Sequence, residues 1–237
     1  MRLLQYLLFF ITFTVSSQID LRIDSITSVD SIPNERKFTI TYHIENLSDN
    51  EISFFLNPNG LVPNSRASMS RDIVFKVFQN DEFIDIDNIF GDRNTSSFME
   101  KMKAAKTDEE RKAIMNARYK ELNIDVKSEI EEAKNDENYY LKQQSKRLMS
   151  DIFTIKPKEK ITFIKIIFWD KTRYLKFGDA EYYLDEKMPH YFELTLNLMK
   201  EQFKEKLLPE DYEKIMKNPY FINGWIVSNK MEINFGE

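Results

Sequence analysis

The stretch from Arg36 to Pro58 constrains the fold of this chain more than any other. Apolar side chains occupy every second position of its first half: Phe38, Ile40, Tyr42 and Ile44. This alternation is typical of a β-strand with one face on a core and the other in water. A polar turn at 46–50 follows, after which Ile52, Phe54 and Leu56 resume the pattern. We therefore predict two consecutive strands and a β-rich core built around them.

The N-terminal segment predicts a protein that leaves the cytoplasm. Arg2 precedes an apolar run from Leu3 to Val15, and Ser16 and Ser17 follow it. A basic start, a short apolar middle and a small-residue exit form a secretory signal peptide. The run is shorter than the ~20 residues that a membrane-spanning helix needs. We therefore expect residues 1–18 to be a signal peptide and the mature protein to be secreted or periplasmic, without a membrane span. A retained N-terminal anchor is the alternative.

Composition narrows the class of protein further. The net charge of -5 and the sequence pI near 5.4 argue against nucleic-acid binding, which usually requires a basic patch. The chain has no Cys, so disulfides cannot support it and stability must come from burial. A mature chain of roughly 220 residues can bury about 70% of its unfolded surface, which is enough for one good core.

The middle of the chain changes character between Ser96 and Ser150. This segment has neither Gly nor Pro, and its 12 basic and 11 acidic residues nearly cancel. Thr107 and Glu110 have the spacing of a capping box, which begins a helix. Apolar side chains at helical spacing follow at Met115, Tyr119 and Leu122. We predict a helical insertion over about 96–150, with a smaller helical excursion at about 199–218.

Strand patterns lie on both sides of this insertion. We predict strands at 20–29, 37–46, 52–56, 73–79, 82–86, 159–169, 190–198 and 224–235. We expect a mainly β fold with helical insertions (α+β), in which residues 19–237 form a single domain. Inserting a long segment into one domain costs little, since each doubling of loop length adds only about 0.6 kcal/mol of closure entropy.

Two strands carry further expectations about burial. Residues 159–169 are apolar on both faces, which predicts a central strand covered on both sides. In the last strand, Trp225, Val227, Met231, Ile233 and Phe235 share one face. A break in the first strand's alternation at Ile26 predicts a bulge or bend there.

A resemblance gives the β-fold a more specific form. YHIENLSDNEISFFLNP resembles the second and third strands of immunoglobulin-like modules in secreted bacterial proteins, and YFELTLNL with GWIVSNKMEINF resembles their last two. The resemblance implies an immunoglobulin-like antiparallel β-sandwich that carries the helical insertion. It lacks the Cys…Trp…Cys pattern of antibody-type domains. By analogy alone, it implies a binding role and contributes no catalytic residue.

The two histidines do not complete a site on the sequence evidence. His43 alternates with core residues and is expected on the solvent face of its strand, whereas His190 stands at a strand entrance. A zinc site would need two or more further carboxylate ligands. Without Cys or a G-x-S-x-G motif, the sequence also offers no recognisable nucleophile. We therefore assign no catalytic residue and no resident cofactor.

An acidic run, which also contains Glu82, gives the best metal candidate. Its candidate ligands are Asp81, Asp85, Asp87 and Asp92. Hard carboxylates in a loop suit Ca²⁺, although the spacing is not that of an EF-hand. Asp85 and Asp87 also fit the wet face of a strand.

Two sequons begin at Asn46 and Asn94. They matter only in a eukaryotic secretory pathway. The Lys-, Ile-, Phe- and Asn-rich composition is more typical of bacteria, so we interpret both as chance.

The helical insertion carries the functional hypothesis. Its narrow apolar stripe either packs back on the protein or forms a surface for a partner, with Tyr119, Leu122, Tyr139 and Tyr140 as candidate contacts. We hypothesise a non-enzymatic module that binds a protein or a component of the cell envelope. One alternative is a carboxylate- or metal-dependent hydrolase on the same sandwich, and another is a purely structural role in an envelope complex.

Overall fold

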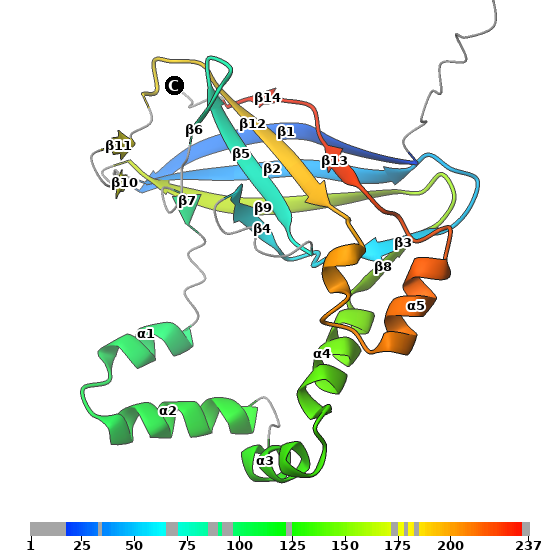
Figure 1. The fold of residues 1–237 in the computed structure, drawn as a ribbon. Helices are drawn as coiled ribbons and strands as arrows, with labels where there is room; N and C mark the ends of the chain where they lie inside the picture. The colour runs from blue at the N-terminus through cyan, green and yellow to red at the C-terminus, as the bar shows by residue number, and fades with distance from the viewer. Residues whose placement is uncertain are drawn as a thin grey trace, which may run out of the picture.

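The computed structural model describes residues 18–32, 35–64, 71–84, 90–91, 97–121, 125–171, 175–177, 180–182 and 185–233. Over these ranges the protein is a mixed α+β fold with several antiparallel sheets and no closed barrel (Figure 1). The strands are β1 Ile19–Ile32, β2 Glu35–Asn46, β3 Ile52–Phe55, β4 Leu61–Pro63, β5 Ile73–Gln79, β6 Glu82–Ile84, β7 Phe90–Gly91, β8 Ile152–Ile155, β9 Lys160–Asp170, β10 Leu175–Phe177, β11 Ala180–Tyr182, β12 His190–Asn197, β13 Trp225–Val227 and β14 Met231–Glu232. The helices are α1 Ser97–Ala104, α2 Asp108–Glu121, α3 Val126–Asn135, α4 Tyr139–Ser150, the 3-10 turn η2 Glu201–Phe203 and α5 Pro209–Lys217.

Two large sheets contain most of the strands. The first has the order β1-β2-β9-β7, and all its pairs are antiparallel. The second has the order β13-β12-β5-β4, with β14 paired to β12 and β6 paired to β5. Only the β4–β5 pair is parallel among the described pairs. The small ribbon β3-β8 continues the β2–β9 pairing beyond the turns that end those strands.

One core joins the two large sheets. Inward side chains of β1 and β2, such as Leu21 and Tyr42, belong to the same buried cluster as Phe75 of β5 and Phe192 of β12. The alternation on β2 and β12 places these side chains as the sequence predicts. A second buried cluster is formed by side chains of α4, α5 and the segments beside them. Its members are Phe55, Leu148, Phe203, Leu207, Ile215 and Phe221.

The four helices between β7 and β8 differ in how they contact the rest of the protein. α4 docks against α5, because the buried Ser145 hydroxyl donates to Asp211 at 2.5 Å and accepts from the Leu208 amide at 3.0 Å. None of the described side chains of α1, α2 or α3 belongs to either buried cluster. Figure 1 shows α1 and α2 beyond the edge of the strands. No helix in the described part of the chain is long and apolar enough to cross a membrane.

Several local predictions are confirmed. The Thr107 hydroxyl accepts from the Glu110 amide at 3.2 Å, and the Glu110 carboxylate accepts from the Thr107 amide at 3.3 Å, which is a capping box. Asn80 and Asp81 form the β5–β6 turn with φ of 53° and 81°, as a two-residue hairpin requires. Pro209 begins α5.

The expectation that both faces of 159–169 are covered is wrong. The side chains of Ile164 and Ile166 on β9 are 65% and 43% exposed, whereas Ile167 is buried. The outer face of this sheet is uncovered there, because the described helices pack elsewhere. The bulge in β1 also lies earlier than expected, between Ile23 and Ser25.

The predicted inward face of the last strand is also wrong in part. Trp225 and Val227 are 63% and 52% exposed, and Ile226 packs against the core instead. The strand is broken, because Ser228 and Asn229 bond sideways to neighbouring strands. The Ser228 hydroxyl accepts from the Leu194 amide at 2.8 Å, and the Asn229 amide oxygen accepts from the Ile23 amide at 2.8 Å. Ile233 is buried as predicted, and Phe235 lies outside the described residues.

The side chain of Asn46, the last residue of β2, links that strand to the end of β8 in the β3-β8 ribbon. It is fully buried, and its amide nitrogen donates to the carbonyls of Asn50, Ile155 and Lys156 at 2.7, 3.1 and 3.0 Å. Its oxygen accepts from the amide and hydroxyl of Ser48 at 2.9 and 2.8 Å. The Asn46 side chain is therefore fully engaged in hydrogen bonds within the fold.

We predict that Asn46→Ala lowers the free energy of unfolding by about 2–4 kcal/mol, since it leaves buried carbonyls without a donor. Urea unfolding followed by circular dichroism would measure the change. Asn50→Ala is the matched control, because the Asn50 side chain is exposed, and it should change stability by less than about 0.5 kcal/mol. Equal effects of the two variants would contradict the assigned role.

Candidate binding groove between the first two helices

Local sequence explains why α1 and α2 form helices without support from the core. The capping box begins α2, acidic residues fill its first turn, and basic residues fill its last turn. Each of these placements complements the helix dipole. α2 nevertheless buries none of its residues. Its apolar side chains therefore face either α1 or solvent.

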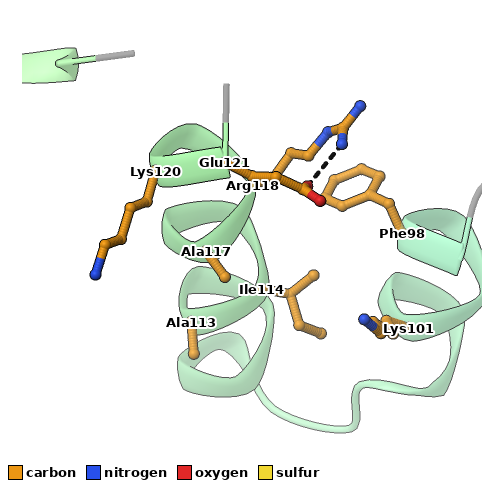
Figure 2. Close-up of a pocket in the computed structure, with 8 residues that line it drawn as sticks. All are labelled: Phe98, Lys101, Ala113, Ile114, Ala117, Arg118, Lys120 and Glu121. Carbon is orange, nitrogen blue, oxygen red and sulfur yellow. Dashed lines mark hydrogen bonds and ion pairs between the residues drawn. The ribbon is translucent and has the colours of Figure 1, made fainter. Parts of the chain in front are cut away.

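A groove of about 700 Å³ lies between these two helices. It is lined by Phe98, Lys101, Ala113, Ile114, Ala117, Arg118, Lys120 and Glu121. Figure 2 shows Phe98 reaching from α1 toward α2 and Ile114 reaching from α2 toward α1. The floor is thus apolar and built from both helices, whereas charged side chains surround it.

The charges around the groove are mostly positive. Arg118 donates to the Glu121 carboxylate at 2.7 Å, so this pair is internally neutral (Figure 2). Lys101 and Lys120 are exposed and make no ion pair with any described residue. Since Glu121 is the only carboxylate among the described lining residues, the groove favours a negatively charged occupant with an apolar part.

The aromatic residues predicted as partner contacts do not gather in this groove. Tyr119 is partly buried on α2 and is not part of the lining. Tyr139 is buried on α4 and makes an edge contact with Tyr140, whose side chain is 74% exposed. Leu122 lies outside the described residues. Of the three that the structure describes, Tyr140 is the most exposed, and it lies on α4 rather than at the groove.

Of the four predicted calcium ligands, only Asp81 lies among the described residues. Asp81 lies at the β5–β6 turn, where its exposed carboxylate is 3.6 Å from the Lys230 ammonium. Asp85, Asp87 and Asp92 lie outside the described residues. The calcium hypothesis therefore stays a prediction.

Both histidines are buried, which corrects the expectation of a surface His43. His43 lies on the outer face of β2 but is only 3% exposed, because neighbouring side chains of β1 cover it. His190 is fully buried in the other large sheet, and burial lowers its pKa even though Nδ1 lies 2.8 Å from the Met188 carbonyl oxygen. The two rings belong to different sheets, so they do not form one site.

A buried arginine, Arg36, lies near the start of β2 and lowers the pKa of a neighbouring carboxyl group. The Asp30 carboxylate accepts from Arg36 at 2.5 and 2.9 Å and from Lys171 at 2.5 Å. These hydrogen bonds, that of Arg36 first, hold the pKa of Asp30 well below its ordinary value. Glu186 accepts from Arg36 at 3.2 Å, and the guanidinium lies 5.9 Å from the Trp169 ring centre. Because charge partners surround Arg36, we interpret this cluster as structural.

Sequence reasoning located the helices but missed the groove. Ala113, Ile114 and Ala117 do recur at helical spacing, which is the signal that was available. No family model, curated protein or solved structure matches this chain. Function therefore has to be inferred from the geometry of the chain itself.

The Arg36 cluster predicts a specific pH dependence of stability. The pKa of Asp30 is lower in the folded protein than the ordinary 3.8, so its contribution is present above that pH and is lost as the pH falls below it. Asp30→Asn should therefore lower the urea midpoint at pH 7. The gap between variant and parent should narrow as the pH falls from about 5 to about 2. A gap of constant size would contradict the assigned ion pair.

Proposed function

We propose that this protein is an extracytoplasmic, non-enzymatic binding module whose α1–α2 groove holds an acidic, apolar segment of a protein partner. The observation that carries the proposal is an apolar floor left open between two helices whose described side chains join neither core. A function that needs a catalytic pair has less support here, because the lining residues that the structure describes include one carboxylate and no histidine.

The lengths of the helices favour a partner. α1 has 8 residues and α2 has 14. Isolated helices shorter than about 12–15 residues are marginal in water, and most helical stability in proteins comes from packing an apolar face. A partner that covers Phe98 and Ile114 would supply the packing that the described sheets do not.

Charge selects the chemistry of that partner. Lys101 and Lys120 have no ion-pair partner in the described part of the chain and stand beside the apolar floor. A segment with apolar side chains on one face and Asp or Glu at its edge matches both features, as helix-in-groove recognition does elsewhere.

The strand order supports an immunoglobulin-like body for this module. In a constant-type immunoglobulin domain one sheet has the order ABED and the other CFG. With β1, β2, β5, β7, β9, β12 and β13 as A to G, the sheets here have the orders ABED and GFC. The α1–α4 insertion then occupies the D–E connection. The β3-β8 ribbon and the parallel β4 are departures from that plan.

The signal-peptide pattern supports an extracytoplasmic location. On this proposal residues 1–18 are removed, and β1 begins at Ile19, directly after the expected cleavage. Intact-mass measurement of protein isolated from the source cells should find a chain that starts near Ser17 or Gln18. A chain that retains Arg2 would contradict cleavage.

A cross-linking experiment tests the groove directly. A photo-reactive residue at Ala117 should attach to the bound segment in an envelope extract, and mass spectrometry should identify that segment as apolar and rich in Asp and Glu. Lys101→Glu with Lys120→Glu should reduce the yield at least tenfold, because it reverses both free charges at the groove.

The matched control reverses one charge on each helix away from the groove, with Lys103→Glu and Lys112→Glu. It should keep the parent yield. Equal losses in the two double variants, or a cross-linked segment without acidic residues, would contradict the proposal. A different outcome is that the protein binds phosphatidylglycerol vesicles, that this binding depends on Lys101 and Lys120, and that no protein cross-link forms. The partner would then be a lipid surface instead of a protein.

A further inference from the structure

Three potential metal ligands meet on the outer face of the first sheet. They belong to β1 and β2, whereas the groove is formed by α1 and α2. Asp20 of β1 is directly opposite Glu45 of β2, and His43 lies two residues before Glu45 on the same face. One ligand atom from each residue can be chosen so that all three lie within 4.8 Å of one another. The His43 ring is 4% exposed, and the two carboxylates are partly buried.

A fourth residue orients the histidine. Asp24 belongs to the bulged part of β1, and its carboxylate oxygens lie 2.8 and 2.9 Å from His43 Nδ1. Because an ionised carboxylate only accepts, Nδ1 carries a proton and donates, and in the neutral ring Nε2 then presents its lone pair. Metal-bound histidines almost always have such a carboxylate or carbonyl behind them.

The other ring nitrogen lacks a hydrogen bond from the described residues. The nearest oxygen recorded for Nε2 is Asp20 Oδ2 at 3.9 Å, which is too long for a hydrogen bond. In the neutral ring, Nε2 of this largely buried side chain thus offers a lone pair to two carboxylates, which cannot donate to it when ionised. A cation between them would satisfy all three groups.

The two carboxylates lie opposite each other on β1 and β2, and Lys160 of β9 is opposite Glu45 on its other side. Like charges directly opposite each other on paired strands are destabilising. Asp20 and Glu45 form such a pair, and neither makes an ion pair with Lys or Arg among the described residues. Arg22 is opposite His43 but is exposed and has no ion pair in the described part of the chain.

We infer that Asp20, His43 and Glu45 bind a divalent transition metal, for which Zn²⁺ is the best match. One imidazole and two carboxylates are ligands that Zn²⁺ accepts, whereas Ca²⁺ takes oxygen ligands and more of them. Zinc bonds of about 2.1 Å place tetrahedral ligand atoms roughly 3.4 Å apart. The three groups must therefore close by roughly an ångström, which the rotamers of the part-exposed Asp20 and Glu45 allow.

The bound metal would have a structural consequence. It would tie the start of β1 to the end of β2, beside the turn that Asn46 organises. Three protein ligands leave the fourth position to water or to a donor from another molecule. This site is independent of the α1–α2 groove, so either can be disproved without the other.

Isothermal titration of the untagged, EDTA-treated protein with ZnCl₂ tests the site. We expect one Zn²⁺ per chain, and a higher melting temperature with metal than without it. Asp20→Asn and Glu45→Gln should each weaken binding at least tenfold while leaving the metal-free melting temperature within a few degrees. Both side chains are part-exposed, so these variants should fold even if His43→Gln does not.

Asp24→Asn separates positioning from ligation. It should weaken Zn²⁺ binding by about 10–100-fold, as loss of an outer carboxylate usually does, and keep the stoichiometry. Asp72→Asn is the control, because Asp72 directly precedes β5 of the other large sheet. This variant should bind Zn²⁺ like the parent. Absence of 1:1 binding at 100 µM ZnCl₂ (about a hundredfold above micromolar affinity), or unchanged binding in Asp20→Asn and Glu45→Gln, would overturn the inference.

Discussion

The hydrogen bonds of the buried Asn46 amide join the turn after β2 to the turn between β8 and β9. The β2 and β9 strands pair along their length, and their continuations β3 and β8 pair again beyond the turns. Both turns need partners for backbone groups that leave the sheet at that point. Asn46 supplies a donor to both turns, because its side chain contacts the carbonyls of Asn50, Ile155 and Lys156. The helical insertion returns to the body at β8, and Ile155 is the last residue of that strand.

Much of the fold is predictable from local patterns. The alternation on β2 and β12, the Asn80–Asp81 turn and the Thr107 capping box each depend on residues a few positions apart. The face of β9 was not predictable, because Ile164 and Ile166 carry no signal that the outer side of their sheet stays open. Similarly, the inward turn of Ile226 depends on the sideways bonds of Ser228 and Asn229 to distant strands.

The candidate sites show the same limit. Asp20 and Glu45 are far apart in sequence, and only the register of β1 against β2 brings them beside His43. Asp24 lies in the β1 bulge between Ile23 and Ser25, whereas the sequence pattern predicted a bulge at Ile26. In the helices, spacing predicts an apolar stripe on α2, but it does not indicate whether a sheet covers the stripe. The structure leaves that stripe to α1 and to the groove.

These features divide the described protein into a body with two buried clusters and a helical pair, α1 and α2, whose described side chains join neither cluster. Hydrogen exchange measured by mass spectrometry on the free, full-length protein tests this division most directly. We expect amides of β2 and β9 to exchange only through global unfolding, and amides of α1 and α2 to exchange through local opening, orders of magnitude faster. Equal protection of α2 and β2 would show that the helices are already packed within the chain, and it would contradict the proposed open groove.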